Sequence, residues 1–144
     1  MKENVIINIT GFQPDVQGDE PVAMTMPGIY MRKGDTVWLA YDQADEDGNV
    51  SACRMKICHK TVELTRKGSI VSQMFFEEGT EYACSYATAY GQLDMSIVTD
   101  SVGICSDENH PVDLELRYRL YTDGEFVSNC ILRMTCEKVS KHNI

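Results

Sequence analysis

The stretch VDLELRYRLY at residues 112–121 alternates apolar and polar side chains without a break. Because successive side chains of a strand point to opposite faces, this two-residue period predicts a β-strand with one buried and one solvent-facing side. Asp123-Gly124 then marks a tight turn, and residues 130–137 alternate in the same way. The segment is therefore typical of an antiparallel β-hairpin.

The same alternation recurs along the rest of the chain, separated by turn residues such as Gly34, Gly68 and Gly79. No segment shows a sustained helical period. Pro27-Gly28 interrupts the second expected strand and predicts a bulge or bend there. The expected strands cover residues 5–10, 22–32, 36–42, 50–59, 62–65, 69–78, 82–87, 93–97, 112–121 and 130–137.

About ten strands in one flat sheet would expose edges and one apolar face, so closure is physically favoured. We expect an all-β fold, a single antiparallel meander closed into a barrel of about 8–10 strands. A sandwich is the alternative. The 144 residues contain no linker and form one domain, residues 1–144.

The net charge and the cysteine content limit the classes of function that the sequence suggests. The net charge of −9 repels phosphate backbones and anionic lipid, so we expect neither nucleic acid nor membrane as a partner. No signal peptide is evident at the start of the sequence, which favours a cytoplasmic location and reduced thiols for the six cysteines. The cysteines lack C-x-x-C spacing, and we expect no metal and no cofactor.

Catalytic and ion-binding motifs fail at particular residues. Asp45, Asp47 and Gly48 resemble part of a calcium loop, but that register places Gln43 at the first position and Arg54 at the twelfth. The sequence lacks a G-x-S-x-G elbow and the glycine-rich phosphate loops. We therefore name no catalytic residue and expect a protein that is not an enzyme.

A succession of residues in the middle and at the end of the chain is typical of one known family. The residues are Gly68-Ser69, Ser72-Gln73-Met74, Phe76-Glu77, Gly79, Tyr86, Thr88, Tyr90-Gly91, Leu93, Val98-Thr99, the alternating strand Asp113 to Tyr121, and Phe126-Val127-Ser128-Asn129. They resemble the YwiB-like family of bacterial proteins of unknown function, and the resemblance spans nearly the whole chain. It implies a calycin-like barrel, similar in plan to lipocalins and fatty-acid-binding proteins, and it implies no activity. Ala89 departs from the proline that the family places before Tyr-Gly.

One polar set suggests a ligand site. Arg117, Arg119 and Tyr121 share a strand face, and Arg133 lies on the next strand of the hairpin. Three guanidinium groups together would bind a carboxylate or phosphate if they pointed into the barrel. The competing interpretation places this face on the barrel exterior, because the opposite face is the apolar one.

These observations favour a barrel that binds a small, partly apolar ligand in its interior or at its mouth, and an acidic one if the arginines face inward. The alternative is a filled barrel that acts as an interaction or scaffold module, for example as a homodimer. A third hypothesis is an enzyme that uses paired carboxylates. The volume of the interior and the direction of Arg117 distinguish the first two.

Overall fold

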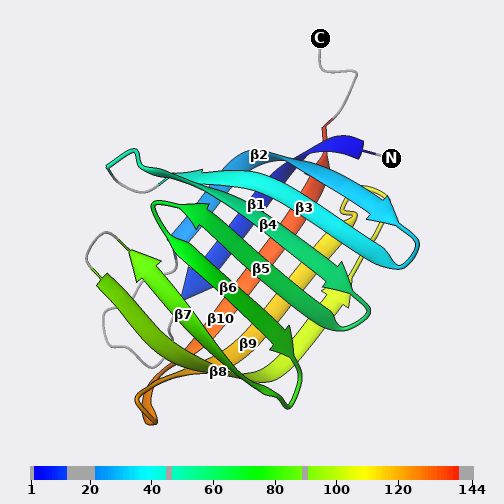
Figure 1. The fold of residues 1–144 in the computed structure, drawn as a ribbon. Helices are drawn as coiled ribbons and strands as arrows, with labels where there is room; N and C mark the ends of the chain where they lie inside the picture. The colour runs from blue at the N-terminus through cyan, green and yellow to red at the C-terminus, as the bar shows by residue number, and fades with distance from the viewer. Residues whose placement is uncertain (1, 13–21, 45–46, 89–90, 140–144) are drawn as a thin grey trace.

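The computed structural model describes residues 2–12, 22–44, 47–88 and 91–139, and the account below concerns these. They form ten antiparallel strands (Figure 1). The strands are β1 (Lys2–Phe12), β2 (Val22–Lys33), β3 (Thr36–Ala44), β4 (Val50–Cys58), β5 (Thr61–Gly68), β6 (Val71–Glu77), β7 (Glu81–Thr88), β8 (Gly91–Cys105), β9 (Val112–Thr122) and β10 (Glu125–Lys138).

The strands close into a barrel in which each pairs with its neighbours in sequence. β1 and β10 complete the circle, with Asn8 opposite Thr135 (Figure 1). The predicted all-β antiparallel meander and its closure are confirmed. Closure satisfies the backbone groups that an open sheet would leave unpaired at its two edges.

The core follows from the alternation along each strand. In β9, Val112, Leu114 and Leu116 are buried, whereas Asp113 and Arg117 are exposed. The inward side chains of the other strands join them and fill most of the barrel. The side chains with almost no exposed surface include Val5, Ile7, Leu39, Met55, Val62, Leu64, Phe76, Ile97 and Met134.

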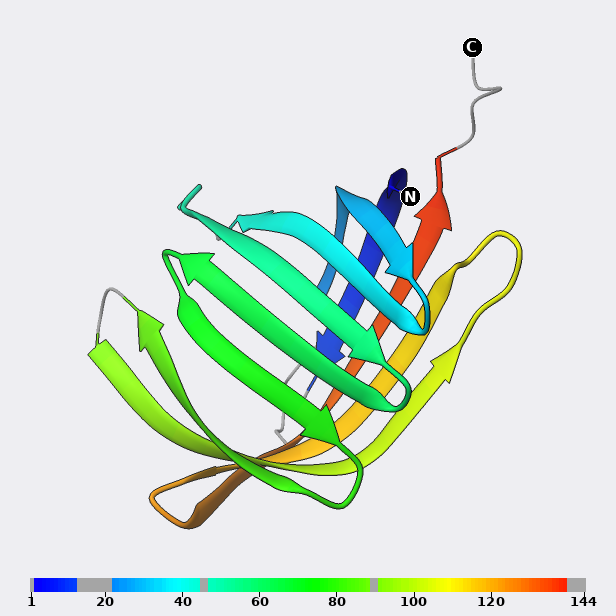
Figure 2. The ribbon, with the colours of Figure 1, turned by 45° about the vertical axis from the view of Figure 1, so that its right-hand side comes forward.

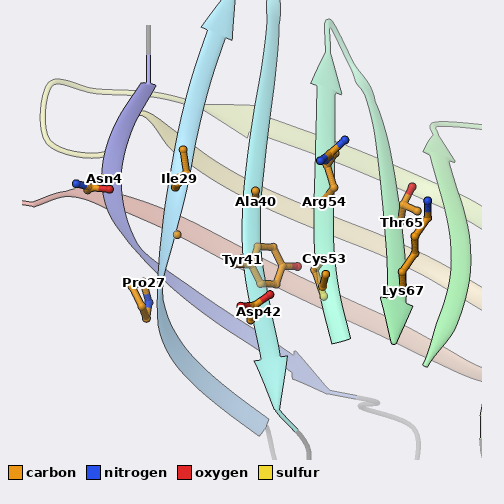
Figure 3. Close-up of a pocket in the computed structure, with 12 residues that line it drawn as sticks. Asn4, Pro27, Ile29, Ala40, Tyr41, Asp42, Cys53, Arg54, Thr65 and Lys67 are labelled. Atoms are coloured by element: carbon orange, nitrogen blue, oxygen red, sulfur yellow. The ribbon is translucent and has the colours of Figure 1, made fainter. Parts of the chain in front are cut away.

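The expected irregularity at Pro27-Gly28 takes the form of a bend. β2 runs from Val22 to Lys33, and its pairing with β1 continues through Pro27 and Gly28 without a shift of register. Figure 3 shows the strand changing direction beside Pro27. The register shifts lie elsewhere, between Thr99 and Ser101 in β8 and between Phe126 and Ser128 in β10. Asp45 and Ala89, which enter the calcium-loop and family arguments, lie outside the described residues.

The two ends of the barrel differ. In an antiparallel meander the even-numbered strands all begin at one end, which we call the mouth (Figure 2, where β4, β6 and β8 begin at the left). Six large apolar side chains are exposed near these beginnings: Val22, Val50, Val71, Leu93, Phe126 and Val127. Toward the opposite end, Val5, Val62 and Leu114 are 0% exposed. A hollow of about 320 Å³, whose lining includes Tyr30 and Ile57, lies at that end. Packed core residues therefore separate this hollow from the mouth.

Candidate functional site

A cavity of about 140 Å³ lies inside the barrel toward the mouth. Its polar lining comes from Tyr41, Gln43 and Arg66. The rest of the lining is mostly apolar: Ile9, Gly11, Val22, Met24, Met55, Leu64 and Leu132. An apolar pocket with a few converging polar groups is the usual form of a small-molecule site.

Arg66 reaches this cavity because of its place on β5. It continues the inward series Val62, Leu64, Arg66, and it lies opposite Cys53 on β4 and Ser72 on β6. The backbone therefore directs a guanidinium group into the barrel, where a charged group is costly unless it is paired.

The guanidinium of Arg66 has few partners. Its Nη1 lies 3.6 Å from the sulfur of Met74, and its Nε is buried without a hydrogen-bond acceptor. Among the described residues, no carboxylate forms an ion pair with it. A buried donor without an acceptor marks a place where a ligand or water can bind.

Neutral polar groups surround Arg66. Burial raises the pKa of Tyr41 to about 12, with the neighbouring Cys53 adding to the rise and the charge of Arg66 opposing it. Burial also raises the pKa of Tyr118 and of the Cys53 thiol, again against the charge of Arg66. Both phenols therefore remain protonated near neutral pH and can donate hydrogen bonds to an anion.

Two further buried polar atoms lie in the same region. The hydroxyl oxygens of Ser72 and Thr99 have no hydrogen-bond partner within the described part of the chain. Ser72 lies opposite Arg66, and Thr99 lies opposite Tyr118. We call Arg66, Tyr41, Cys53, Ser72, Thr99 and Tyr118 the polar belt. Its unsatisfied atoms distinguish this level of the barrel from the apolar core beyond it.

The arginines of the predicted cluster lie on the outer surface. Glu115 accepts hydrogen bonds from Nε of Arg117 at 2.8 Å and Nε of Arg133 at 2.9 Å. Arg119 pairs with Asp100, with 3.0 Å between Nη2 and Oδ1, and its Nη1 lies 3.1 Å from the Tyr121 hydroxyl. The structure thus brings Arg117 and Arg133 together on Glu115, with all three arginines outside the barrel. Their inward orientation, which an interior anion site would require, is not observed, and any binding role at the surface remains a prediction.

A second hollow lies on the outer surface over β2–β5 (Figure 3). It measures about 570 Å³ and carries Arg54, Thr65 and Lys67 on one side, with Ala40 and Ala52 on its floor. Figure 3 shows the Lys67 side chain running beside Thr65. Although this hollow is larger than the interior cavity, Arg54 and Lys67 are exposed and water screens their charges. We therefore favour the interior cavity as the site.

Neither a metal cluster nor a membrane-spanning helix occurs in the described part of the chain. There, no three His, Cys, Asp or Glu side chains are grouped so that they could hold a metal ion. None of the same residues belongs to a helix long and apolar enough to cross a membrane. The six cysteines all lie in the described ranges and form no disulfide with one another.

Comparison with known proteins identifies the family of the chain and a similar fold. The model of a domain of unknown function, DUF1934, matches residues 7–134. The chain belongs to the DUF1934 family. This DUF1934 protein is also similar to the crystal structure of the YwiB protein from Bacillus subtilis, with a TM-score of 0.84 and 18% sequence identity. The match covers 96% of this chain and 94% of YwiB, and it confirms the YwiB-like resemblance and the barrel. No curated protein matches the sequence.

The sequence of this DUF1934 protein contains a feature that points to the inward position of Arg66. The alternation identified Val62 and Leu64 as inward, and one more step of the same period reaches Arg66. A basic residue on the apolar face of a strand is therefore the feature that could have located the site.

Proposed function

We propose that this protein binds a small, partly apolar and acidic molecule inside the barrel, with Arg66 as the anion-binding residue. The observation that carries this proposal is the buried Nε of Arg66, which belongs to the cavity lining and has no acceptor among the residues that the structure describes. A carboxylate supplies that acceptor and the missing negative charge together. Such charge-assisted hydrogen bonds are among the strongest that proteins form.

The surroundings of Arg66 suit the same ligand. Tyr41 lines the cavity with a protonated hydroxyl group, and Gln43 adds an amide group to the same lining. The apolar part of the cavity, including Ile9, Leu64 and Leu132, would contact hydrocarbon. The cavity is smaller than the roughly 300–1,000 Å³ of drug-sized sites, which favours a short ligand or one that is enclosed in part.

Butyrate is a suitable probe because it combines a carboxylate with a short apolar chain. We expect it to shift the amide NMR signals of cavity residues such as Ile9 and Tyr41 in the native protein. Arg66→Met should weaken this binding about tenfold to a hundredfold, since a hydrogen bond to a charged group is worth about 1.5–3 kcal/mol. Arg117→Met is the matched control, because that guanidinium lies outside and pairs with Glu115.

The Arg66→Lys variant separates a binding role from a folding role. It keeps the charge and loses the planar fork, so we expect intermediate affinity in a folded barrel. No shift with butyrate in the native protein, or equal binding by native protein and Arg66→Met, contradicts the proposal. Native mass spectrometry of protein isolated from its own cells gives a second measurement, in which a retained acidic ligand supports binding and a ligand-free dimer supports the scaffold alternative.

A further inference from the structure

The interior cavity extends from the charged Arg66 side chain toward the outside of the barrel. Arg66 lines it on one side, and Val22 at the beginning of β2 lines it on another. The side chain of Val22 is 63% exposed. A ligand held at Arg66 therefore has an apolar path toward the mouth.

The opposite direction is closed. Met55 and Leu64, which line the cavity, are 1% and 2% exposed, and Val62 beyond them is 0% exposed. Because protein cores pack at the density of organic crystals, an extended chain cannot enter this region without displacing side chains. Any part of a ligand that exceeds the cavity must leave through the mouth.

Part of the exposed apolar surface at the mouth faces such a chain. Val22 and Leu93 belong to the inward series of β2 and β8, whereas Val50 and Val71 alternate with buried serines and face the outside of the barrel. Val22 faces inward, since it lies opposite Gly11 in the series Ile7, Ile9, Gly11. Met24, the next inward residue of β2, is partly buried and lines the cavity. Unbranched methionine side chains adapt readily to ligands of different shape.

The charge at the inner end selects the head group. Arg66 is the one cationic side chain among the described residues that line the cavity. A carboxylate carries a single charge and balances it, whereas a phosphate monoester near −2 leaves a buried charge without a partner. The site therefore fits a monocarboxylate better than a phosphate.

We propose that the ligand is a monocarboxylic acid whose apolar chain is longer than the cavity, bound with its carboxylate at Arg66 and its chain leaving past Val22. This inference rests on the function proposed above and adds the chemical class and the orientation of the ligand. It also assigns a role to the exposed valine at the beginning of β2.

A series of linear acids tests the orientation. Binding of butyrate, hexanoate, octanoate and decanoate is measured by NMR titration or calorimetry at concentrations below micelle formation. We expect affinity to rise up to about fourfold for each added methylene, the value for full burial, and to keep rising to decanoate. Arg66→Met should weaken all four acids. Val22→Ser should weaken octanoate and decanoate about twofold to fourfold, and should weaken butyrate clearly less, because butyrate makes fewer contacts at the exit of the cavity.

Three controls accompany the series. Val139→Ser changes an exposed valine that follows β10 and should affect none of the acids. Octylamine has the same chain with the opposite charge and should not compete with octanoate. Octyl phosphate should bind more weakly than octanoate.

The two proposals fail differently. If butyrate does not bind, the proposed function fails. If butyrate binds at Arg66 but affinity does not rise with chain length, or Val22→Ser has no effect on decanoate, the long-chain inference is wrong and the function stands. Equal binding of octylamine or octyl phosphate would overturn the assignment of the head group.

Discussion

Arg66 on β5 lies directly opposite Cys53 on β4, and both side chains belong to the interior of the barrel. The burial of Cys53 raises its pKa, although the positive charge of Arg66 acts in the opposite direction. The thiol is therefore neutral near pH 7 and supplies no negative charge to Arg66. This relationship leaves a positive charge on the inner surface of the barrel, although the protein as a whole is acidic.

The raised pKa of Tyr41 predicts that the protein loses stability at alkaline pH. This pKa is raised to about 12 in the folded protein, mainly by burial, whereas an exposed tyrosine titrates near 10. The folded state thus gains stability while the phenol is protonated, and loses about 2–3 kcal/mol as the pH rises from about 10 to 12. Urea denaturation at pH 8 and pH 11 should show about half of this loss, roughly 1–1.5 kcal/mol, because pH 11 lies midway between the two pKa values.

Tyr41→Phe should show a smaller loss over that pH interval, because the buried group that must ionise is gone. Tyr121→Phe on the outer surface is the control and should keep the pH dependence of the native protein. Identical profiles for Tyr41→Phe and the native protein would contradict the prediction.

Phe76 should be among the most costly core residues to truncate. It is 1% exposed, and its ring lies edge-on to Tyr118 with 5.0 Å between the ring centroids. Phe76→Ala should lower the free energy of unfolding by about 3–5 kcal/mol, since it leaves a cavity in a packed core. The neighbouring Phe75 is only half-buried, against Tyr82. Phe75→Ala should cost clearly less in the same urea experiment, and equal costs would contradict the packing described here.

Gly68 at the end of β5 should not tolerate a side chain. Its φ is +140°, and a Cβ there would lie 2.5 Å from the carbonyl oxygen of Val50 and 2.9 Å from Cα of Ser51. Gly79 also has a positive φ, of +81°, but has open space around it. Gly79→Ala should therefore cost about 1–2 kcal/mol from backbone strain alone. Gly68→Ala should cost more, because backbone atoms must also move, and thermal unfolding of the two variants compares them.

Glu115 should contribute little to stability although it bridges Arg117 and Arg133. The three side chains are 37–55% exposed, so water and salt screen the pairs. The hydrogen bonds from both arginines lower the pKa of Glu115, so the small stabilisation is present at neutral pH and is lost as the pH falls below its usual value of 4.5. Glu115→Gln should lower the free energy of unfolding by less than about 1 kcal/mol at pH 7.

The effect of Glu115→Gln should also shrink in 0.5 M NaCl. A loss of several kcal/mol that persisted in salt would mean that this pair is a major structural element. Urea denaturation with and without salt distinguishes the two outcomes.

The alternation of apolar and polar side chains in the sequence was enough to predict most of the fold. The two-residue period predicted β9 almost to its ends, whereas β10 begins at Glu125, before the predicted start at residue 130. Turn glycines such as Gly34 and Gly124 marked the hairpins. These features depend on local backbone geometry, which a short stretch of sequence specifies. The bend at Pro27 was predicted for the same reason.

Only the closed barrel decided which way the arginines point and which residues form the candidate site. The two-residue period of the sequence shows only that Arg117 and Leu116 face opposite sides of the strand. Closure of the barrel decides that Leu116 lies inside and Arg117 outside. Tyr41, Arg66 and Tyr118 lie on three strands that are far apart in the sequence. They come within electrostatic reach of one another because closure brings the inner faces of β3, β5 and β9 around one small volume.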